Sequence, residues 1–201
     1  MRKIIATLFL MVSSLCIMPV FANPEEVNVY SARKGYLIKP LLSAFEKDTN
    51  IKVNIISGKA KALQKRIEQE GKNTRADVLL TVDAGNLYKA KYNNLLMQIK
   101  SNILEKLIPE YLRDKEGYWY GLSIRSRVIM YNPKKVKKRD LSTYEDLSNS
   151  KWKGRICIRS SSNIYNQSLL ASLVSYLGKE KSQDWARGIV NNFSRAPKGN
   201  D

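Results

Sequence analysis

Short apolar segments rich in β-branched residues alternate with amphipathic helical segments through the first half of this 201-residue sequence. Three of these segments have the length and composition of buried strands: residues 27–31, 51–56 and 76–82. Helical periodicity follows each of them in turn, over residues 36–48, 60–71 and 84–92. Parallel strands need a crossover between them, and a helix is the usual one. The sequence therefore predicts an α/β fold with mainly parallel sheets.

Small and polar residues directly follow each predicted strand: Tyr30–Arg33, Ser57–Lys59 and Thr81–Ala84. Because ligands gather at the carboxyl ends of strands in open α/β sheets, these turns are candidates for the wall of a binding cleft. Ordinary loop chemistry explains them equally well. Asp83 is also expected to cap the helix that begins at residue 84.

The second half of the chain repeats the order of strand, turn and helix. Residues 155–158 are expected to form a short buried strand, with Cys157 as a small core residue. The serine-rich turn 160–163 supplies N-cap chemistry for a helix, whose free N–H groups suit an anion. Tyr165 falls in the first turn of that helix, at the edge of an apolar stripe. At that position a side chain can both pack and reach solvent.

Further elements are expected between and after these regions: a helix at 104–113, two successive strands within 118–131, a short helix at 143–147 and a final amphipathic helix at 183–193. The run 134–139 (KKVKKR) is the main cluster of basic residues, and it has the composition of a solvated loop.

The first 22 residues have the three parts of an export signal. Arg2 and Lys3 form the basic start, residues 4–20 the apolar core, and residues 20–22 a small-x-Ala-like cleavage site. We therefore expect residues 1–22 to be a cleaved signal peptide and the protein to be periplasmic. A membrane-tethered form is the alternative.

Composition argues against several classes of function. The sequence contains no histidine, which excludes His-based catalytic triads and the usual zinc sites. No nucleophile–base spacing is recognisable either, so we do not expect an enzyme. The formal net charge is +17, but the basic residues are spread along most segments, and we expect no nucleic-acid partner.

Several blocks of the sequence resemble the periplasmic ferric-iron-binding proteins of iron ABC transporters, the ferric-binding-protein and iron-deficiency-induced group. The matching blocks are Tyr30–Arg33, Ile51–Asn54, Arg75–Asp83, Leu141–Leu147, Trp152–Arg155, Ile158–Ser168 and Gly199–Asp201. The resemblance covers essentially all of the chain after residue 22.

The resemblance implies a two-lobed periplasmic-binding-protein-like fold that closes around one Fe³⁺ and docks on an inner-membrane ABC permease. We expect residues 23–125 to form the N-terminal α/β lobe and residues 126–201 to form part of the second lobe of a monomer. Fe³⁺ prefers oxygen ligands, and a tyrosine phenolate serves once the metal displaces its proton. The sequence has 11 tyrosines, which is compatible with this chemistry.

The resemblance also assigns a metal ligand. Tyr165 matches a tyrosine that ligates iron in the group. Lys34 and Gly35 stand where many members have a His-Tyr pair of ligands, and neither residue is a plausible substitute. Tyr36 is one position away and would reach the metal only after a local shift.

Arginines are the candidates for charge compensation beside the metal. A synergistic anion would be held, or the charge of the ligands offset, by Arg33, Arg125 and Arg127. Arg159, next to the serine turn, is a candidate for the same role. Their alternative interpretation is as surface or structural arginines.

Members of the group run well past the block at which this sequence ends, and an adjacent pair of iron-ligating tyrosines lies in that later part. No adjacent tyrosine pair occurs here. The resemblance therefore implies an incomplete second lobe and iron binding that is impaired or dependent on a further piece. Two alternatives stay open: a solute-binding protein for an anion or small organic ligand, and a fragment without ligand function.

Overall fold

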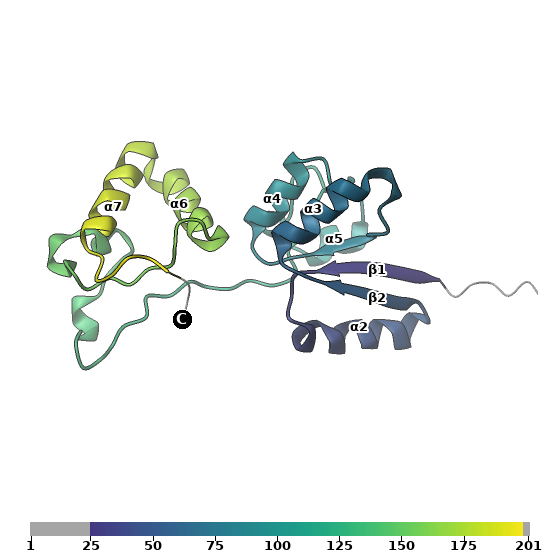
Figure 1. Cartoon of the computed structure of the whole chain (residues 1–201), viewed down its shortest axis with the longest axis horizontal. Coiled ribbons are helices and arrows are strands. Elements are labelled where there is room, and N and C mark those ends of the chain that lie inside the picture. Colours follow the sequence, from purple (N-terminus) through teal and green to yellow (C-terminus); the bar gives the residue numbers. More distant parts are fainter. Residues whose placement is uncertain (1–24, 199–201) are drawn as a thin grey trace, which may run out of the picture.

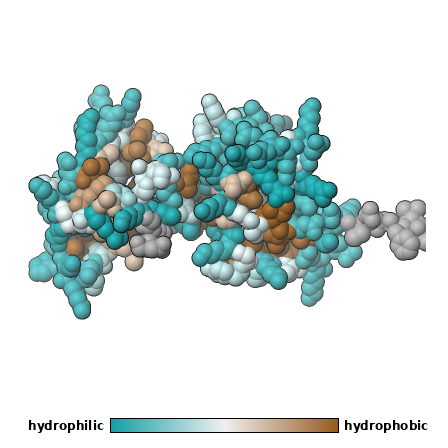
Figure 2. Space-filling view, in the orientation of Figure 1, coloured by the Kyte–Doolittle hydropathy of each residue, from teal (hydrophilic) through white to brown (hydrophobic). Residues whose placement is uncertain are grey.

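The computed structural model describes residues 25–198, which form two lobes joined by an extended segment (Figure 1). Hydrophilic residues cover most of the face shown in Figure 2, on both lobes. The expected signal peptide, residues 1–22, lies outside the described residues. Among the helices within residues 25–198, none has the length and apolar character needed to cross a membrane.

A parallel sheet forms the centre of the first lobe, as predicted. Its strands are β1 (Glu26–Ser31), β2 (Lys52–Ser57) and β3 (Val78–Leu80), in the order β2-β1-β3. β3 is shorter than the predicted strand because the side chain of Asp77 replaces a ladder partner: its Oδ2 accepts from the backbone N–H of Asn28 at 2.7 Å. The three carboxyl ends, at Ser31, Ser57 and Leu80, lie at one edge of the sheet, which faces the second lobe (Figure 1).

Helices cover both faces of this sheet (Figure 1). One face carries α2 (Gly35–Thr49), and the other carries α3 (Ala60–Glu70), α4 (Ala84–Tyr92) and α5 (Asn102–Leu107). The single turn η1 (Gly71–Asn73) follows α3. Tyr30 of β1 packs against Leu63 and Ile67 of α3 in the core of the lobe.

The helix predicted over residues 104–113 is divided in two. α5 ends at Leu107, and a 3₁₀ turn, η2 (Glu110–Leu112), follows Pro109. Proline has no N–H to donate, and it drives the residue before it out of the helical region. Ile108 accordingly has φ −106° and ψ 117°.

The two strands predicted within residues 118–131 are absent from the described structure. An isolated antiparallel bridge joins Arg113 to Tyr120, and beyond Gly121 the chain runs extended toward the second lobe. Within residues 25–198, no backbone–backbone hydrogen bond involves residues 122–131. An extended segment becomes a strand only when a neighbour supplies the ladder, and the described residues supply none.

The second lobe is built on two helices, α6 (Ile164–Leu177) and α7 (Lys179–Asn191). Leu173, Trp185 and Ile189 form its core. Three 3₁₀ turns precede the helices: η3 (Lys138–Asp140), η4 (Glu145–Ser148) and η5 (Ser150–Trp152). The short helix predicted at 143–147 thus exists as the 3₁₀ turn η4, and the final helix begins four residues earlier than predicted.

The strand predicted at residues 155–158 is reduced to isolated parallel bridges, Ile156 with Phe193 and Arg159 with Lys198. Ile156 and Ile158 pack against the core, so Cys157 between them points the other way. The expectation of a core cysteine is therefore wrong: Cys157 is exposed, and its Sγ lies 3.0 Å from Ser194 Oγ.

Candidate metal and anion site

Tyr165 is held at the start of α6 by the predicted cap. Asn163 precedes the helix, and its side-chain oxygen accepts from the backbone N–H of Tyr165 at 3.0 Å. The turn before it is closed by the Asn163 N–H, which donates to the carbonyl of Ser160 at 3.0 Å. The ring of Tyr165 is half-buried, and this agrees with its place at the edge of the apolar stripe.

Three arginines surround the ring of Tyr165. Arg125 Nη2 donates to Tyr165 Oη at 2.8 Å. The guanidinium carbons lie 5.1 Å (Arg125), 5.0 Å (Arg127) and 5.9 Å (Arg159) from the ring centroid, within range of cation–π attraction. Arg125 and Arg127 come from the extended segment, where alternate residues project to one side. The structure thus brings two of the three predicted arginines to Tyr165, together with Arg159.

These three cations have no carboxylate to balance them in the described part of the chain. The ion pairs within residues 25–198 lie elsewhere, on Arg66, Lys91, Lys151 and Arg187. Three guanidinium groups around one phenol repel one another and attract negative charge, and guanidinium suits carboxylate oxygens in particular. The site is therefore built to accept an anion or an anionic complex beside the phenol oxygen.

The other two residues expected at the site are not brought to Tyr165. The backbone N–H of Arg33 donates to Ser31 Oγ at 3.2 Å, just beyond β1. Tyr36 lies in the first turn of α2 and is 71% exposed, with Lys34 Nζ 5.9 Å from its ring centroid. Its helix α2 covers the face of the sheet opposite the one that carries α4 (Figure 1).

The two lobes touch one turn further along α6. Ser168 Oγ donates to Asp83 Oδ1 at 2.5 Å, and Lys89 Nζ donates to Gln167 Oε1 at 3.1 Å. Gly85 permits this approach: a Cβ added there would lie 2.9 Å from Ile164 Cδ1. Sequence reasoning identified Asp83 as the cap of α4, which is confirmed, but it missed this link between lobes.

Asp83 adopts an unusual backbone conformation at this contact, with φ 71° and ψ 129°. A non-glycine residue in such a region carries about 1–3 kcal/mol of strain and persists only when its surroundings hold it. The side chain of Asp83 accepts two hydrogen bonds here, one from the Gly85 N–H at 2.9 Å and one from Ser168. The strain therefore lies at the junction of the lobes, next to the helix that carries Tyr165.

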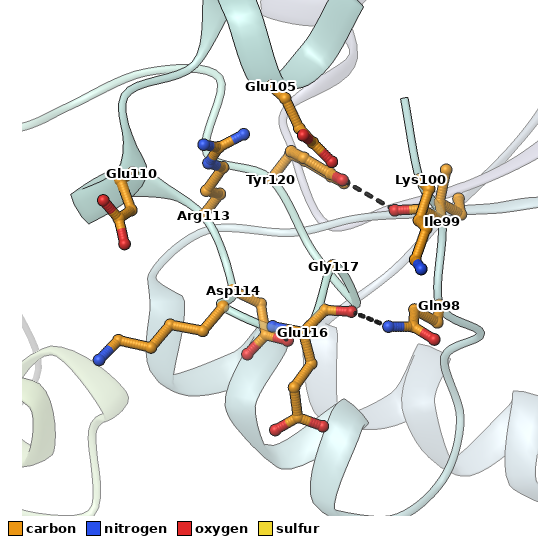
Figure 3. A pocket seen from close by; sticks show the side chains of 11 residues that line it. Gln98, Ile99, Lys100, Glu105, Glu110, Arg113, Asp114, Glu116, Gly117 and Tyr120 are labelled. Carbon is orange, nitrogen blue, oxygen red and sulfur yellow. Dashed lines mark hydrogen bonds between the residues drawn. The ribbon is translucent and has the colours of Figure 1, made fainter. Parts of the chain in front are cut away.

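A hollow of about 300 Å³ lies in the first lobe (Figure 3). Its wall mixes both charges and is closed by two hydrogen bonds to backbone carbonyls, from Tyr120 Oη to Ile99 (2.8 Å) and from Gln98 Nε2 to Glu116 (2.6 Å). Asp114 and Glu116 are already paired with Lys91. Within residues 25–198, no group of three His, Cys, Asp or Glu side chains is placed to hold a metal ion.

The site around Tyr165 thus offers a particular chemistry. Its protein donor is a phenol oxygen, and its charged groups are cations that would hold an anion. A hard, highly charged cation such as Fe³⁺ fits a phenolate, and an oxygen-rich anion held by the arginines would complete its coordination. These features are those of a site for a metal ion bound together with an anion.

The fold is that of a class of solute-binding proteins. Residues 73–200 match the family of bacterial extracellular solute-binding proteins, and the chain belongs to this family.

Several proteins similar to this chain are named for iron. Iron uptake protein A1 of Synechocystis is 52% identical over 88% of this chain and 49% of its own length. The Fe(3+)-binding periplasmic protein of Serratia marcescens is 31% identical over 88% of this chain and 52% of its own. A Trichodesmium protein solved with iron and citrate superposes with a TM-score of 0.83 at 51% identity, over 88% of this chain and 56% of that one.

These similarities confirm the resemblance to the ferric-binding group and the α/β fold class. The chain spans about half the length of the curated relatives it matches.

Proposed function

We propose that this chain belongs to the solute-binding component of a ferric-iron ABC uptake system and binds Fe³⁺ through the phenolate of Tyr165. An anion held by Arg125, Arg127 and Arg159 shares the coordination. The observation that carries the proposal is the cluster of three guanidinium groups around Tyr165, with Arg125 Nη2 2.8 Å from the phenol oxygen. Two relatives named for iron and the Trichodesmium structure solved with iron and citrate support it.

Membership of the solute-binding family also supports proposals about export, location and delivery of the iron. Residues 1–22 act as an export signal, and the protein works in the periplasm as a monomer that delivers iron to an inner-membrane permease. Residues 23–125 and 126–201 form the two walls of the cleft. The chain binds and releases its cargo without catalysing a reaction, as its solute-binding relatives do. Arg33 and Tyr36 serve the site only if the loop after β1 rearranges.

Iron binding by these residues alone is weak. A single phenolate is one donor, whereas Fe³⁺ takes several oxygen ligands and is hydrolysed in water when they are missing. We therefore expect the chain to bind ferric citrate, in which the anion brings most of the donors, rather than the bare ion. Because the phenol must lose its proton to bind, affinity falls as the pH is lowered.

Titration with ferric citrate tests this proposal. A phenolate bound to Fe³⁺ gives a visible charge-transfer band, which should appear with the unaltered protein and disappear in Tyr165→Phe. Tyr176→Phe is the matched control, because Tyr176 lies on the same helix and is 79% exposed. If the band is absent in the unaltered protein, or survives in Tyr165→Phe, the assignment of the ligand is wrong.

The arginine cluster also favours a second candidate function, capture of an anion or small organic acid without iron. Citrate alone then binds as tightly as ferric citrate, and Tyr165→Phe leaves that binding intact. Calorimetric titrations with citrate, with and without Fe³⁺, separate the two functions. Arg127→Gln should weaken binding in both cases, since the guanidinium faces the anion in either one.

A further inference from the structure

A basic loop lies at the edge of the second lobe. Its residues 134–139 (KKVKKR) follow Pro133 and lead into the 3₁₀ turn η3. All five cationic residues of the loop are exposed, and within residues 25–198 none of them forms an ion pair. The loop lies on the side of the second lobe away from the first lobe (Figure 1). Its positive charge is therefore unbalanced and open to solvent.

A second basic segment, the turn 151–155, lies against this loop. Arg155 Nη2 donates to the backbone carbonyl of Lys135 at 2.7 Å. Lys151 Nζ and the guanidinium carbon of Arg155 lie 5.2 and 5.4 Å from the ring of Trp152, which is 4% exposed. The buried tryptophan thus anchors the turn, and Arg155 joins the turn to the loop.

Residues 134–139 and 151–155 together form one surface, the basic face, with a large excess of positive charge. Neither range contains Asp or Glu. Lys151 is paired with Asp146 at 2.8 Å, and the other cations of the basic face have no ion pair in the part of the chain that the structure describes. The cations are Lys134, Lys135, Lys137, Lys138, Arg139, Lys151, Lys153 and Arg155. Charges of one sign gathered in this way attract an anionic partner.

The composition of the basic face suits a flat anionic surface better than a single anion. Six of its eight cations are lysines, whose ammonium groups are compact point charges on flexible stems. Recognition of one phosphate or carboxylate at a fixed position favours the bidentate fork of arginine instead. A bilayer with anionic lipids presents many phosphate groups without fixed positions, and each Lys or Arg close to it adds to the attraction.

Nucleic acid fits the basic face less well. Sites for single strands combine cations with exposed aromatic rings on which bases stack. The ring of Trp152 is buried beneath Lys151 and Arg155, so it is closed to a base. Duplex DNA is read by a helix or a β-ribbon in the major groove, and η3 is a single turn of three residues.

We propose that the basic face binds the anionic head groups of a lipid bilayer and holds the second lobe against a membrane. The helix α6, which carries Tyr165, lies on the side of the second lobe nearer the first lobe (Figure 1), so contact with a bilayer leaves the candidate site open. The contact needs no iron and is independent of the proposed function.

Vesicle sedimentation tests this proposal. The chain is purified after export, without residues 1–22, so that their apolar side chains cannot cause binding. It is mixed, free of iron, with vesicles of equal parts phosphatidylglycerol and phosphatidylcholine, and with vesicles of phosphatidylcholine alone. We expect binding only where phosphatidylglycerol is present. Binding should be lost at about 1 M salt, where the Debye length falls to about 3 Å.

Paired substitutions locate the binding surface. Lys134→Gln with Lys138→Gln removes two charges from the basic face and should weaken binding to the anionic vesicles about 30-fold, at roughly fivefold per charge. Lys61→Gln with Lys65→Gln makes the same change of net charge at exposed positions on α3, and should change binding by less than about twofold. Lys134→Arg with Lys138→Arg keeps the charge and should keep the binding. All four lysines are exposed, so every variant should melt with the unaltered protein.

Several results would overturn the proposal. Failure to bind the anionic vesicles would do so directly. Equal losses in the two glutamine variants would show that net charge alone drives binding, and equal binding to phosphatidylcholine would show an apolar contact. Displacement of the vesicles by glycerol phosphate would assign the basic face to a single phosphate group. Tighter binding to polyglutamate than to the vesicles would assign it to an acidic protein.

Discussion

At the residue scale, the phenol of Tyr30 ties the sheet of the first lobe to α3. Tyr30 is 1% exposed, and its Oη donates to both carboxylate oxygens of Glu70, at 3.0 and 2.9 Å. Arg66 pairs with Glu70 at 2.6 Å and lies 5.2 Å from the Tyr30 ring centroid, while Thr74 Oγ1 donates to the same carboxylate. Burial, and after it the hydrogen bond with Glu70, raises the pKa of Tyr30, so the phenol stays a donor.

Tyr30→Phe should lower the free energy of unfolding by about 1.5 kcal/mol, the usual size of a hydrogen bond to a charged group. The hydrogen bonds from Arg66 and Thr74 to Glu70 remain in the variant. The substitution therefore removes one donor to the carboxylate and leaves the other two in place. Urea unfolding measures the change. Tyr92→Phe, at a residue that is 77% exposed, is the control and should change stability by less than about 0.5 kcal/mol. Equal effects of the two substitutions would contradict this account.

Glu70 also gives the first lobe a defined response to acid. The hydrogen bond from Arg66, followed by that from Thr74, holds the pKa of Glu70 below its ordinary value of 4.5. A carboxylate with a lowered pKa contributes its full stabilisation above pH 4.5 and loses it as the pH falls through the pKa of the folded state. The difference in stability between the unaltered protein and Glu70→Gln should therefore be constant near neutral pH and shrink below pH 4.5. Melts in a series of buffers measure it, and a difference that grows in acid would reverse the assignment.

At the element scale, α7 lies so close to η4 that one position on it must be glycine. A Cβ added at Gly188 would lie 2.6 Å from the carbonyl oxygen of Ser148 and 2.7 Å from its Cβ. Two side chains of α7 reach the same backbone: Trp185 Nε1 donates to the Tyr144 carbonyl at 2.7 Å, and the cap residue Asn192 donates to the Leu147 carbonyl at 3.0 Å. These contacts fix the distance between the two elements.

Gly188→Ala should destabilise the protein by about 1–3 kcal/mol, because the added methyl group meets backbone rather than a flexible side chain. Gly35→Ala is the matched control. Gly35 begins α2, and a Cβ there meets nothing within 4 Å, so alanine should leave stability unchanged or raise it by about 0.5 kcal/mol. Thermal melts of the two variants measure the contrast. Similar melting temperatures would show that α7 can move away from η4.

Elements whose signals are local could be predicted from the sequence. The helix α4 was predicted to the residue, because Asp83 caps it and its apolar periodicity is self-contained. Two strands were predicted within residues 118–131, but a strand also needs a neighbour, and sequence patterns cannot supply one. Cys157 was misplaced because the segment was taken as buried on both sides, whereas period-2 alternation places Cys157 opposite the isoleucines that flank it.

In the candidate site, too, the local features could be predicted and the long-range contacts could not. A cap within residues 160–163 and the position of Tyr165 in the first turn of the helix are local features, and both were predicted. Arg125 and Tyr165 are 40 residues apart in the chain, and Asp83 and Ser168 are 85 apart. Only the fold brings such pairs together. No property of Ser168 in the sequence distinguishes it from the other serines of its helix.

At the scale of the whole molecule, the contact between α4 and α6 sets how far apart the lobes lie. The Asp83–Ser168 hydrogen bond crosses it at 2.5 Å and helps to hold Asp83 in its strained conformation. The linking segment makes no backbone–backbone hydrogen bonds over residues 122–131 within the described part of the chain, so it offers little resistance to separation. The hydrogen bond therefore helps to hold the two lobes close together.

Ser168→Ala should shift the lobes toward an open arrangement. The lost hydrogen bond is to a charged group and is worth about 1.5 kcal/mol, which corresponds to roughly a tenfold change in the equilibrium between closed and open forms. Fluorescence energy transfer measures it between the exposed thiol of Cys157 in the second lobe and a label on Lys61→Cys in α3. Transfer efficiency should fall in the variant.

Ser172→Ala is the control that distinguishes loss of the Asp83–Ser168 hydrogen bond from a general effect on α6. Ser172 lies one turn further along the helix, and its hydroxyl donates to the carbonyl of Leu169 within the same helix at 2.7 Å. Its removal should leave the transfer efficiency unchanged. If both variants lower it equally, the helix rather than the hydrogen bond governs the separation. If neither does, the remaining contacts of α4 with α6, such as Lys89 with Gln167, are sufficient to hold the lobes together.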